Sequence, residues 1–200
     1  MKIKVFSFFL MAAGLIIFAY GGWKIFDMNR QTDMSLSEAK ETVAAGSSGS
    51  SSKASSEGGK PPESFKTATG EAVGILKIPR LKAELPIVEG TSPDDLEKGV
   101  GHYKESYYPK QNGQIVLSGH RDTVFRRTGE LEIGDVLKIE LSYGSFEYQI
   151  TNTKIVDKDD TSIMTLQHEK EELLLTTCYP FSYVGNAPQR YIIYAKPLES

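Results

Sequence analysis

Residues that cross-link chains or bind metals are scarce in this sequence. Its 200 residues include one cysteine, Cys178, and three histidines, His102, His120 and His168. A single thiol cannot form an intramolecular disulfide, so the fold must be stable without one. No two histidines have the spacing of metal ligands, and we therefore expect neither a metal ion nor any other cofactor.

Basic charge is also scarce beyond the N-terminus. Residues 31–200 carry 19 Lys and Arg against 25 Asp and Glu, and no basic run occurs among them. A nucleic-acid partner is therefore not expected, since its phosphates would be repelled on average. Hydrophobic residues make up 40% and charged residues 24%, which is typical of a globular protein, and the length suits one domain.

A long uncharged run lies near the N-terminus. The 19 residues from Val5 to Trp23 would form a helix of about 28 Å, close to the thickness of a bilayer core. They predict a transmembrane anchor. A cleaved signal peptide is the alternative, but the run is longer than a usual signal sequence and lacks an A-x-A-like site. Lys2 and Lys4 before the run balance Lys24 and Arg30 after it, so charge leaves the orientation open.

Two further signals separate this run from the rest of the chain. Ser35 and Glu38 have the spacing of a capping box and predict a short juxtamembrane helix that ends at Gly46. Residues 45–60 are Ser or Gly at 11 of 16 positions, which predicts a flexible tether with a reach of about 22 Å. The predicted division is an anchor (residues 1–26), a juxtamembrane helix with its linker (27–69) and a folded head (70–200).

The head is predicted to be mainly β. Short runs rich in β-branched and aromatic residues alternate with Gly, Pro and Asn, a pattern typical of a meander or barrel. One short helix is expected, with Ser92 as its N-cap, Pro93 in its first turn and Gly99 at its end. The predicted strands cover residues 74–78, 84–88, 114–118, 136–141, 146–156, 173–177 and 191–195.

Cys178 and Arg190 are candidates for chemistry because of where they stand. Cys178 directly follows the predicted strand 173–177 and precedes Pro180, where a strand must stop. A thiol at a strand end is accessible to substrates, although a buried structural cysteine is the alternative. Arg190 opens the next strand, and antiparallel pairing would place it at the same end of the sheet as Cys178. A guanidinium there can stabilise an oxyanion. An isolated arginine, however, is more often a surface residue.

His120 occupies an equivalent position after the predicted strand 114–118. A Cys/His catalytic pair is defined by geometry rather than sequence spacing, so the sequence makes His120 and Cys178 candidates only. His102 lies among glycines and is predicted to occupy a turn, while His168 lies in a polar, solvated segment.

Three segments together closely resemble the class D sortases of Gram-positive spore-forming bacteria. They are LSGHRDTVF (117–125), LTTCYPF (175–181) and APQRY (187–191), and they occur in the family's order of His, Cys and Arg. The resemblance covers about residues 70–200, the predicted catalytic domain. One departure is Leu174, which stands where the family's TLxTC signature begins with Thr. We expect little effect, since a side chain four residues before the nucleophile should not contact substrate.

The resemblance implies a closed eight-stranded β-barrel, held by a single membrane span with its N-terminus inside and the barrel outside. It also implies a cysteine transpeptidase that anchors surface proteins to the cell wall. Cys178 would form an acyl-thioester with a C-terminal LPxT-type sorting signal, His120 would be the general acid and base, and Arg190 would stabilise the oxyanion. Thr177 would contribute to substrate binding by adding a hydroxyl or an amide to the oxyanion site. The acceptor would be an amine of a lipid-linked peptidoglycan precursor.

Two other functions remain open at this point. A membrane-tethered thiol peptidase would share the acyl-enzyme but resolve it with water. A non-catalytic extracytoplasmic binding module would use Cys178 only as buried filler.

Overall fold

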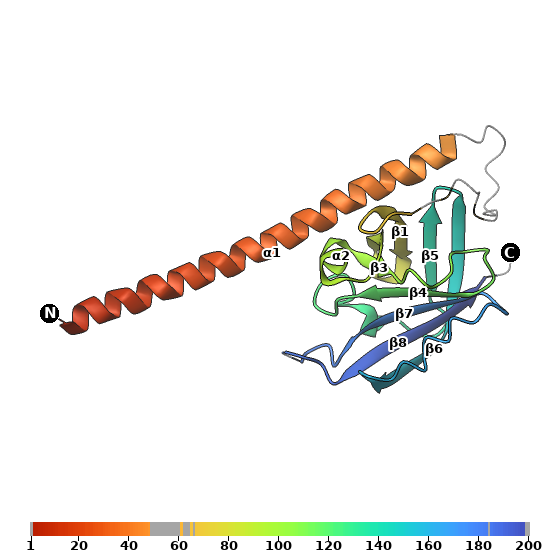
Figure 1. Cartoon of the computed structure of the whole chain (residues 1–200). Helices are drawn as coiled ribbons and strands as arrows, with labels where there is room; N and C mark the ends of the chain where they lie inside the picture. The colour runs from red at the N-terminus through yellow and green to blue at the C-terminus, as the bar shows by residue number, and fades with distance from the viewer. Residues whose placement is uncertain (1, 49–60, 62–64, 66, 184, 199–200) are drawn as a thin grey trace.

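The computed structural model describes residues 2–48, 61, 65, 67–183 and 185–198. In this part of the chain eight strands form a closed barrel in the order β1-β2-β3-β4-β7-β8-β6-β5, and a long helix, α1, runs past it (Figure 1). The helices are α1 (Lys2–Ser48) and α2 (Pro93–Lys98), with 3-10 turns at Pro79–Leu81 and Thr128–Glu130. The strands are β1 (Ala72–Ile78), β2 (Ala83–Glu89), β3 (Val100–His102), β4 (Gln114–Gly119), β5 (Val136–Leu141), β6 (Gly144–Asp157), β7 (Glu172–Tyr179) and β8 (Gln189–Pro197).

The predicted barrel is confirmed, and each of the seven predicted strands corresponds to an observed one. The eighth observed strand, β3, was not predicted, because its three residues are too few to show an alternating pattern. β3 pairs in parallel with β2 and antiparallel with β4, and so joins the two halves of the ring. β1 pairs with β5 and closes it.

The short helix α2 forms as its sequence signals predicted. The Ser92 hydroxyl accepts a hydrogen bond from the Asp95 amide at 3.3 Å, and the Asp95 carboxylate accepts one from the Ser92 amide at 3.0 Å. This capping box satisfies two amides at the start of the helix. Gly99 ends it.

Two apolar clusters lie on opposite faces of the barrel wall. The larger fills the interior and includes Leu76, Leu117, Tyr148, Leu175 and Ile193. A smaller one covers the outer face of β4, β7 and β8 and comprises Val116, Val156, Ile163, Leu174 and Ile192. Because side chains alternate along a strand, every second residue of these three strands belongs to the outer face.

The N-terminal helix differs from the prediction of a span followed by a separate short helix. α1 is continuous, and Ser35 lies inside it, buried, rather than at an N-cap. Gly46 does not stop the helix, which continues to Ser48. A Cβ at Gly46 would lie 1.9 Å from the carbonyl oxygen of Ser142 in the β5–β6 turn. The glycine therefore permits close approach to the barrel. Residues 49–60, most of the predicted tether, lie outside the described residues.

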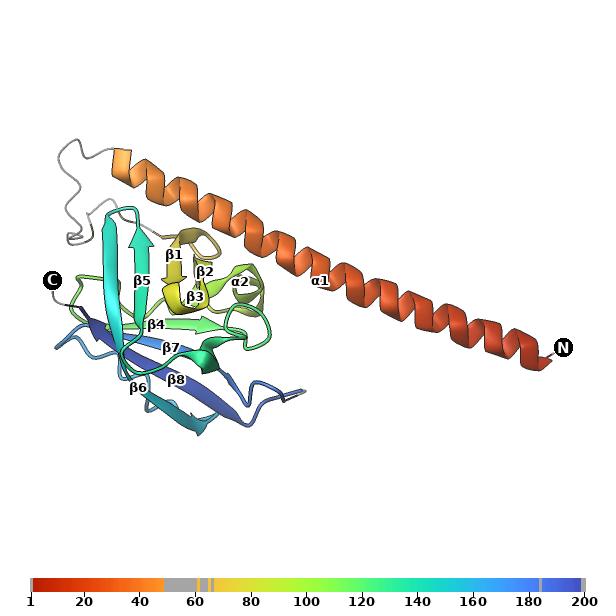
Figure 2. The same cartoon turned by 180° about the vertical axis from the view of Figure 1, so that it is seen from behind.

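The C-terminal half of α1 packs on the outside of β1 and β2. Ala39 is buried against Ala72 and Ile75, with Leu36 and Val43 beside them. β1 is therefore covered on both faces, by the barrel interior and by the helix. In both views the N-terminal half of α1 projects beyond the barrel (Figures 1 and 2). By length and composition, α1 can cross a membrane.

A buried polar cluster joins β2 to β3. His102 lies in β3 and not in the predicted turn, and its Nδ1 is 2.9 Å from the Glu89 carboxylate. Burial raises the pKa of the Tyr108 hydroxyl, which stays protonated and donates to the same carboxylate. Burial opposes the charged form of Glu89, but hydrogen bonds from His102 and Tyr108 outweigh it and hold the pKa of Glu89 below its ordinary value.

The packing of α1 predicts how truncation affects stability. A chain of residues 31–200 keeps the docked helix, whereas residues 61–200 expose Ile75. Since exposing a buried isoleucine costs about 2 kcal/mol, we expect urea denaturation to give the shorter chain a lower free energy of unfolding by about that amount. Ile75→Thr should destabilise the longer chain and hardly affect the shorter one. Equal stability of the two chains would contradict the docking.

The charge on Glu89 predicts a pH dependence. With its pKa lowered in the folded state, Glu89 contributes stability above its ordinary value of 4.5, and this contribution is lost as the pH falls through the folded pKa. We expect Glu89→Gln to lower the free energy of unfolding by about 1–3 kcal/mol at pH 7. Thermal unfolding should show that the difference shrinks below about pH 4.5. A pH-independent difference would refute the argument.

Candidate active site

The three candidate catalytic residues stand at neighbouring strand ends. β4 and β7 run parallel with Gly119 opposite Thr177, so the residues that follow lie side by side, His120 just past the end of β4 and Cys178 near the end of β7. β7 and β8 run antiparallel with Cys178 directly opposite Arg190. Neighbouring strands lie about 4.8 Å apart, so this register brings the three residues to one place. The antiparallel pairing predicted for Cys178 and Arg190 is confirmed.

The same residues also share a face. The outer-face cluster contains Val116 of β4, Leu174 of β7 and Ile192 of β8. Alternation along each strand carries this face on to His120, Cys178 and Arg190. The three side chains therefore lie at the edge of this apolar surface, where polar residues begin. Leu174, the departure from the family signature, is fully buried in that cluster and away from the site.

These side chains line a cleft of about 450 Å³. Cys178 is a free thiol and half-buried. The lining residues are His120, Arg121, Asp122, Lys158, Asp159, Cys178, Gly185, Asn186, Ala187 and Arg190. Sequence reasoning missed Lys158 and Asp159, which follow β6. They reach the cleft because β6 pairs with β8, where the Lys158 amide donates to the Pro188 carbonyl at 3.0 Å, and no local signal predicts that pairing.

Arg190 is held by its own loop. Its Nη1 donates to the carbonyl oxygens of Gln189 at 3.0 Å and Ala187 at 3.3 Å. Among the described residues no carboxylate forms an ion pair with it. Since a guanidinium has five N–H donors, the remaining ones can bind an oxygen in the cleft.

Arg121 is a second guanidinium beside the thiol, and sequence reasoning did not single it out. Its Nη2 donates to the Gly185 carbonyl at 2.8 Å, and its guanidinium carbon lies 5.9 Å from the centre of the Tyr183 ring. Its Nη1 is buried and has no hydrogen-bond partner in the described part of the chain. Arg121 thus ties the end of β4 to the β7–β8 loop.

Thr177 lies on the inner face of β7, unlike Cys178. Its buried hydroxyl donates to the carbonyl oxygen of Gly119 at 2.7 Å. That bond links β7 to β4 at the last pair before the two candidate catalytic residues. The hydroxyl is therefore engaged within the barrel wall and does not line the cleft.

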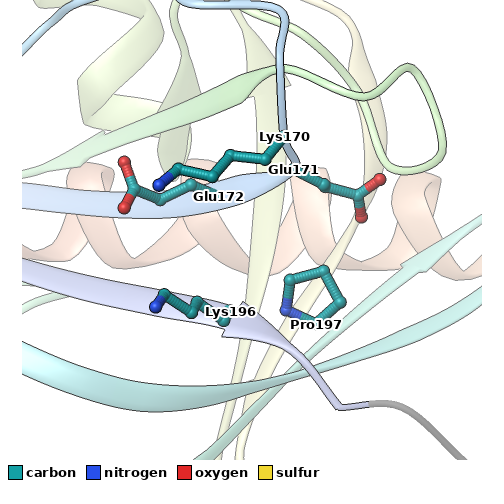
Figure 3. Close-up of a pocket in the computed structure, with 5 residues that line it drawn as sticks. All are labelled: Lys170, Glu171, Glu172, Lys196 and Pro197. Atoms are coloured by element: carbon teal, nitrogen blue, oxygen red, sulfur yellow. The ribbon is translucent and has the colours of Figure 1, made fainter.

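A second hollow, of about 320 Å³, lies at the opposite end of β7 and β8 (Figure 3). Its carboxylates are already bound, since Glu171 accepts from the Tyr148 hydroxyl at 2.6 Å and Glu172 accepts from the Gln114 amide at 3.2 Å. Its lining residues, Lys170, Glu171, Glu172, Lys196 and Pro197, include no thiol or imidazole. The cleft at Cys178 is the better candidate for catalysis.

Comparison with known proteins agrees with this geometry. A family model described as the sortase domain matches residues 76–198. Sortase D of Bacillus subtilis (strain 168) is 67% identical over 193 residues, which cover 96% of this chain and 98% of that protein. Sortase A of Bacillus anthracis is 25% identical over 127 residues, covering 62% of this chain and 58% of that protein.

A solved structure of a Clostridium perfringens sortase D5 transpeptidase shares the fold. Its TM-score is 0.69 at 22% sequence identity, and the match covers 85% of this chain and 99% of that one. With the family established, the non-catalytic binding module is set aside. The chain belongs to the sortase family, whose members are cysteine transpeptidases.

Proposed function

We propose that this protein cleaves LPxT-type C-terminal sorting signals and transfers the sorted protein to an amine of a peptidoglycan precursor. Sortases in general act on surface proteins with sorting signals and on cell wall precursors. The observation that carries the proposal is the placement of Cys178, His120 and Arg190 on one face of three adjacent strand ends, around one cleft.

In the first half-reaction the Cys178 thiolate attacks the carbonyl carbon of the signal's threonine. A C–S bond forms, and the carbonyl electron pair moves to oxygen, where the free N–H donors of Arg190 stabilise the negative charge. Collapse of this intermediate breaks the peptide C–N bond. The His120 imidazolium gives its proton to the leaving amine, and an acyl-thioester remains on Cys178.

In the second half-reaction the acceptor amine attacks the thioester carbon. His120, now neutral, takes a proton from that amine, a C–N bond forms, and the C–S bond breaks to restore the thiolate. One amide bond is exchanged for another, so the cycle needs no external source of energy. With water in place of the amine the same steps give hydrolysis, which is the peptidase alternative.

The hydroxyl of Thr177 takes a positioning role in this proposal, in place of the contribution to the oxyanion site implied by the resemblance. Its hydroxyl bond to Gly119 fixes the relative heights of β4 and β7, and therefore of His120 and Cys178. A shift by one register position would move one of them by about 3.3 Å and turn its side chain to the other face.

We place the protein in the cell membrane with its N-terminus inside and the barrel on the cell-wall side. The first half of α1 provides the single span, in keeping with an anchor at residues 1–26 and a catalytic domain at 70–200. A catalytic domain held there shares its surface with a lipid-linked acceptor.

The roles of the three residues predict distinct losses of activity. Cys178→Ala should form no thioester with an LPxT-type peptide. His120→Ala should lower kcat by about 10²–10⁴-fold, because proton transfer to the leaving amine is lost. Arg190→Lys should lower it by about 10²-fold, because a point charge cannot reproduce the planar donors of the guanidinium. Peptide cleavage followed by chromatography measures all three.

The matched control is His168→Ala, which removes an exposed histidine far from the cleft and should leave turnover unchanged. His102→Ala is unsuitable as a control, because it breaks the buried cluster with Glu89. Thermal unfolding should show each variant folded. Near-normal turnover by Arg190→Lys would remove Arg190 from the oxyanion role.

The proposal also predicts how the acyl-enzyme partitions. Without an added amine, peptide release should be slow and limited by hydrolysis, and the thioester should accumulate as a mass increase on the protein. Adding diaminopimelate or a glycyl peptide should raise turnover and give an amide-linked product. If turnover does not respond and mass spectrometry finds no ligated product, the protein is a peptidase.

A further inference from the structure

The barrel first contacts α1 close to the end of the apolar span. The Thr32 hydroxyl oxygen lies 3.4 Å from the Glu97 carbonyl oxygen in α2, and Lys24 Nζ lies 3.9 Å from the Glu97 carboxylate. Thr32 follows Trp23 by nine residues, which is about 14 Å of helix. A headgroup layer is about 5–8 Å thick, so α2 lies within about one further layer of the lipid headgroups.

The contact continues along the rest of the helix. Thr32 and Gly46 are 14 residues apart, so about 21 Å of α1 lies against β1, β2 and α2. Ala39 is fully buried, and Lys40 forms an ion pair with Glu84 at 3.0 Å. The apolar contact supplies most of the stabilisation, since an exposed ion pair contributes little.

The Ser/Gly-rich segment does not separate the barrel from the membrane. α1 reaches the β5–β6 turn at Gly46, so the first residues of that segment are still part of the docked helix. Residues 49–60 then connect the far end of the helix to the start of the barrel. The contacts between α1 and the barrel are made by residues that precede them in the chain.

The β7–β8 loop, which borders the cleft, lies on the side toward which the span projects. In both views the β7–β8 loop, which carries Gly185 and Ala187 of the cleft, lies on the side of the N-terminal half of α1 (Figures 1 and 2). Tyr183 in this loop is about half exposed. A tyrosine with an apolar ring and a polar hydroxyl suits a membrane–water interface.

We propose that α1 is a rigid stalk that holds the barrel on the headgroup surface of its own membrane, with α2 and the β7–β8 loop facing the phospholipids and the cleft beside them. This inference rests on the membrane anchoring proposed above. In this arrangement the barrel is held at a fixed height above the bilayer, instead of moving freely on a flexible tether. A sorting signal close to the bilayer and a lipid-linked amine then reach Cys178 together.

Fluorescence quenching in vesicles tests the placement without depending on catalysis. The full-length protein is reconstituted in phosphatidylcholine vesicles that carry a headgroup nitroxide lipid, in a Trp23→Phe background that removes the native tryptophan. Tyr183→Trp should lose most of its emission. The matched control is Lys170→Trp at the opposite end of β7, which should keep its emission (Figure 3). Equal quenching at the two positions would overturn the proposal.

Insertions distinguish a stalk from a tether. Eleven helix-forming residues inserted after Asp27 make about three turns and raise the barrel by about 16 Å with little rotation, so quenching of Tyr183→Trp should be lost. The same eleven residues inserted within 49–60 should change nothing. If the linker insertion relieves quenching, or the helix insertion does not, α1 is not a stalk. Turnover of a soluble peptide should stay unchanged in both variants, which confirms folding and separates this failure from failure of the proposed function.

Discussion

The register of β7 between β4 and β8 is the constraint on which the active site depends. β7 is the central strand of these three, and it pairs in parallel with β4 and antiparallel with β8. Cys178 therefore acquires two partners from distant parts of the chain through backbone hydrogen bonds alone. The side chains need no contact with each other to be aligned, since the sheet positions them.

Two apolar clusters keep that register in place. Leu173 and Leu175 point into the barrel, while Leu174 packs outside, so β7 is fixed from both faces. A slip by one residue would expose the inner leucines and bury a threonine without its partner, which the hydrophobic effect and the lost hydrogen bond both oppose. The strand that carries the nucleophile is thus among the most constrained in the molecule.

Sequence reasoning succeeded where the signals were local and failed where distant segments decide. Alternation located seven strands, and the capping box at Ser92 located α2. The capping-box spacing at Ser35 wrongly predicted the start of a helix. α1 packs on the barrel and is continuous through Ser35. The glycines around His102 suggested a turn, but Gly99 and Gly101 instead allow β3 to lie close to Pro86 and Gly90, in and just after β2. The strand ends of Cys178, His120 and Arg190 were visible in the sequence, whereas Lys158 and Arg121 join the cleft only through tertiary pairing.

The covering of β1 by α1 has a consequence for the order of assembly. β1 can pair at once with β2, but its other edge waits for β5, which begins about 60 residues later in the chain. Contacts so far apart in sequence form slowly, and an exposed apolar strand edge is prone to aggregate in the meantime. The helix that covers the outer face of β1 is synthesised before β1 itself. Although β1 pairs with β5 only after a long stretch of chain has been synthesised, one of its apolar faces is therefore covered as soon as it leaves the ribosome or the translocation channel.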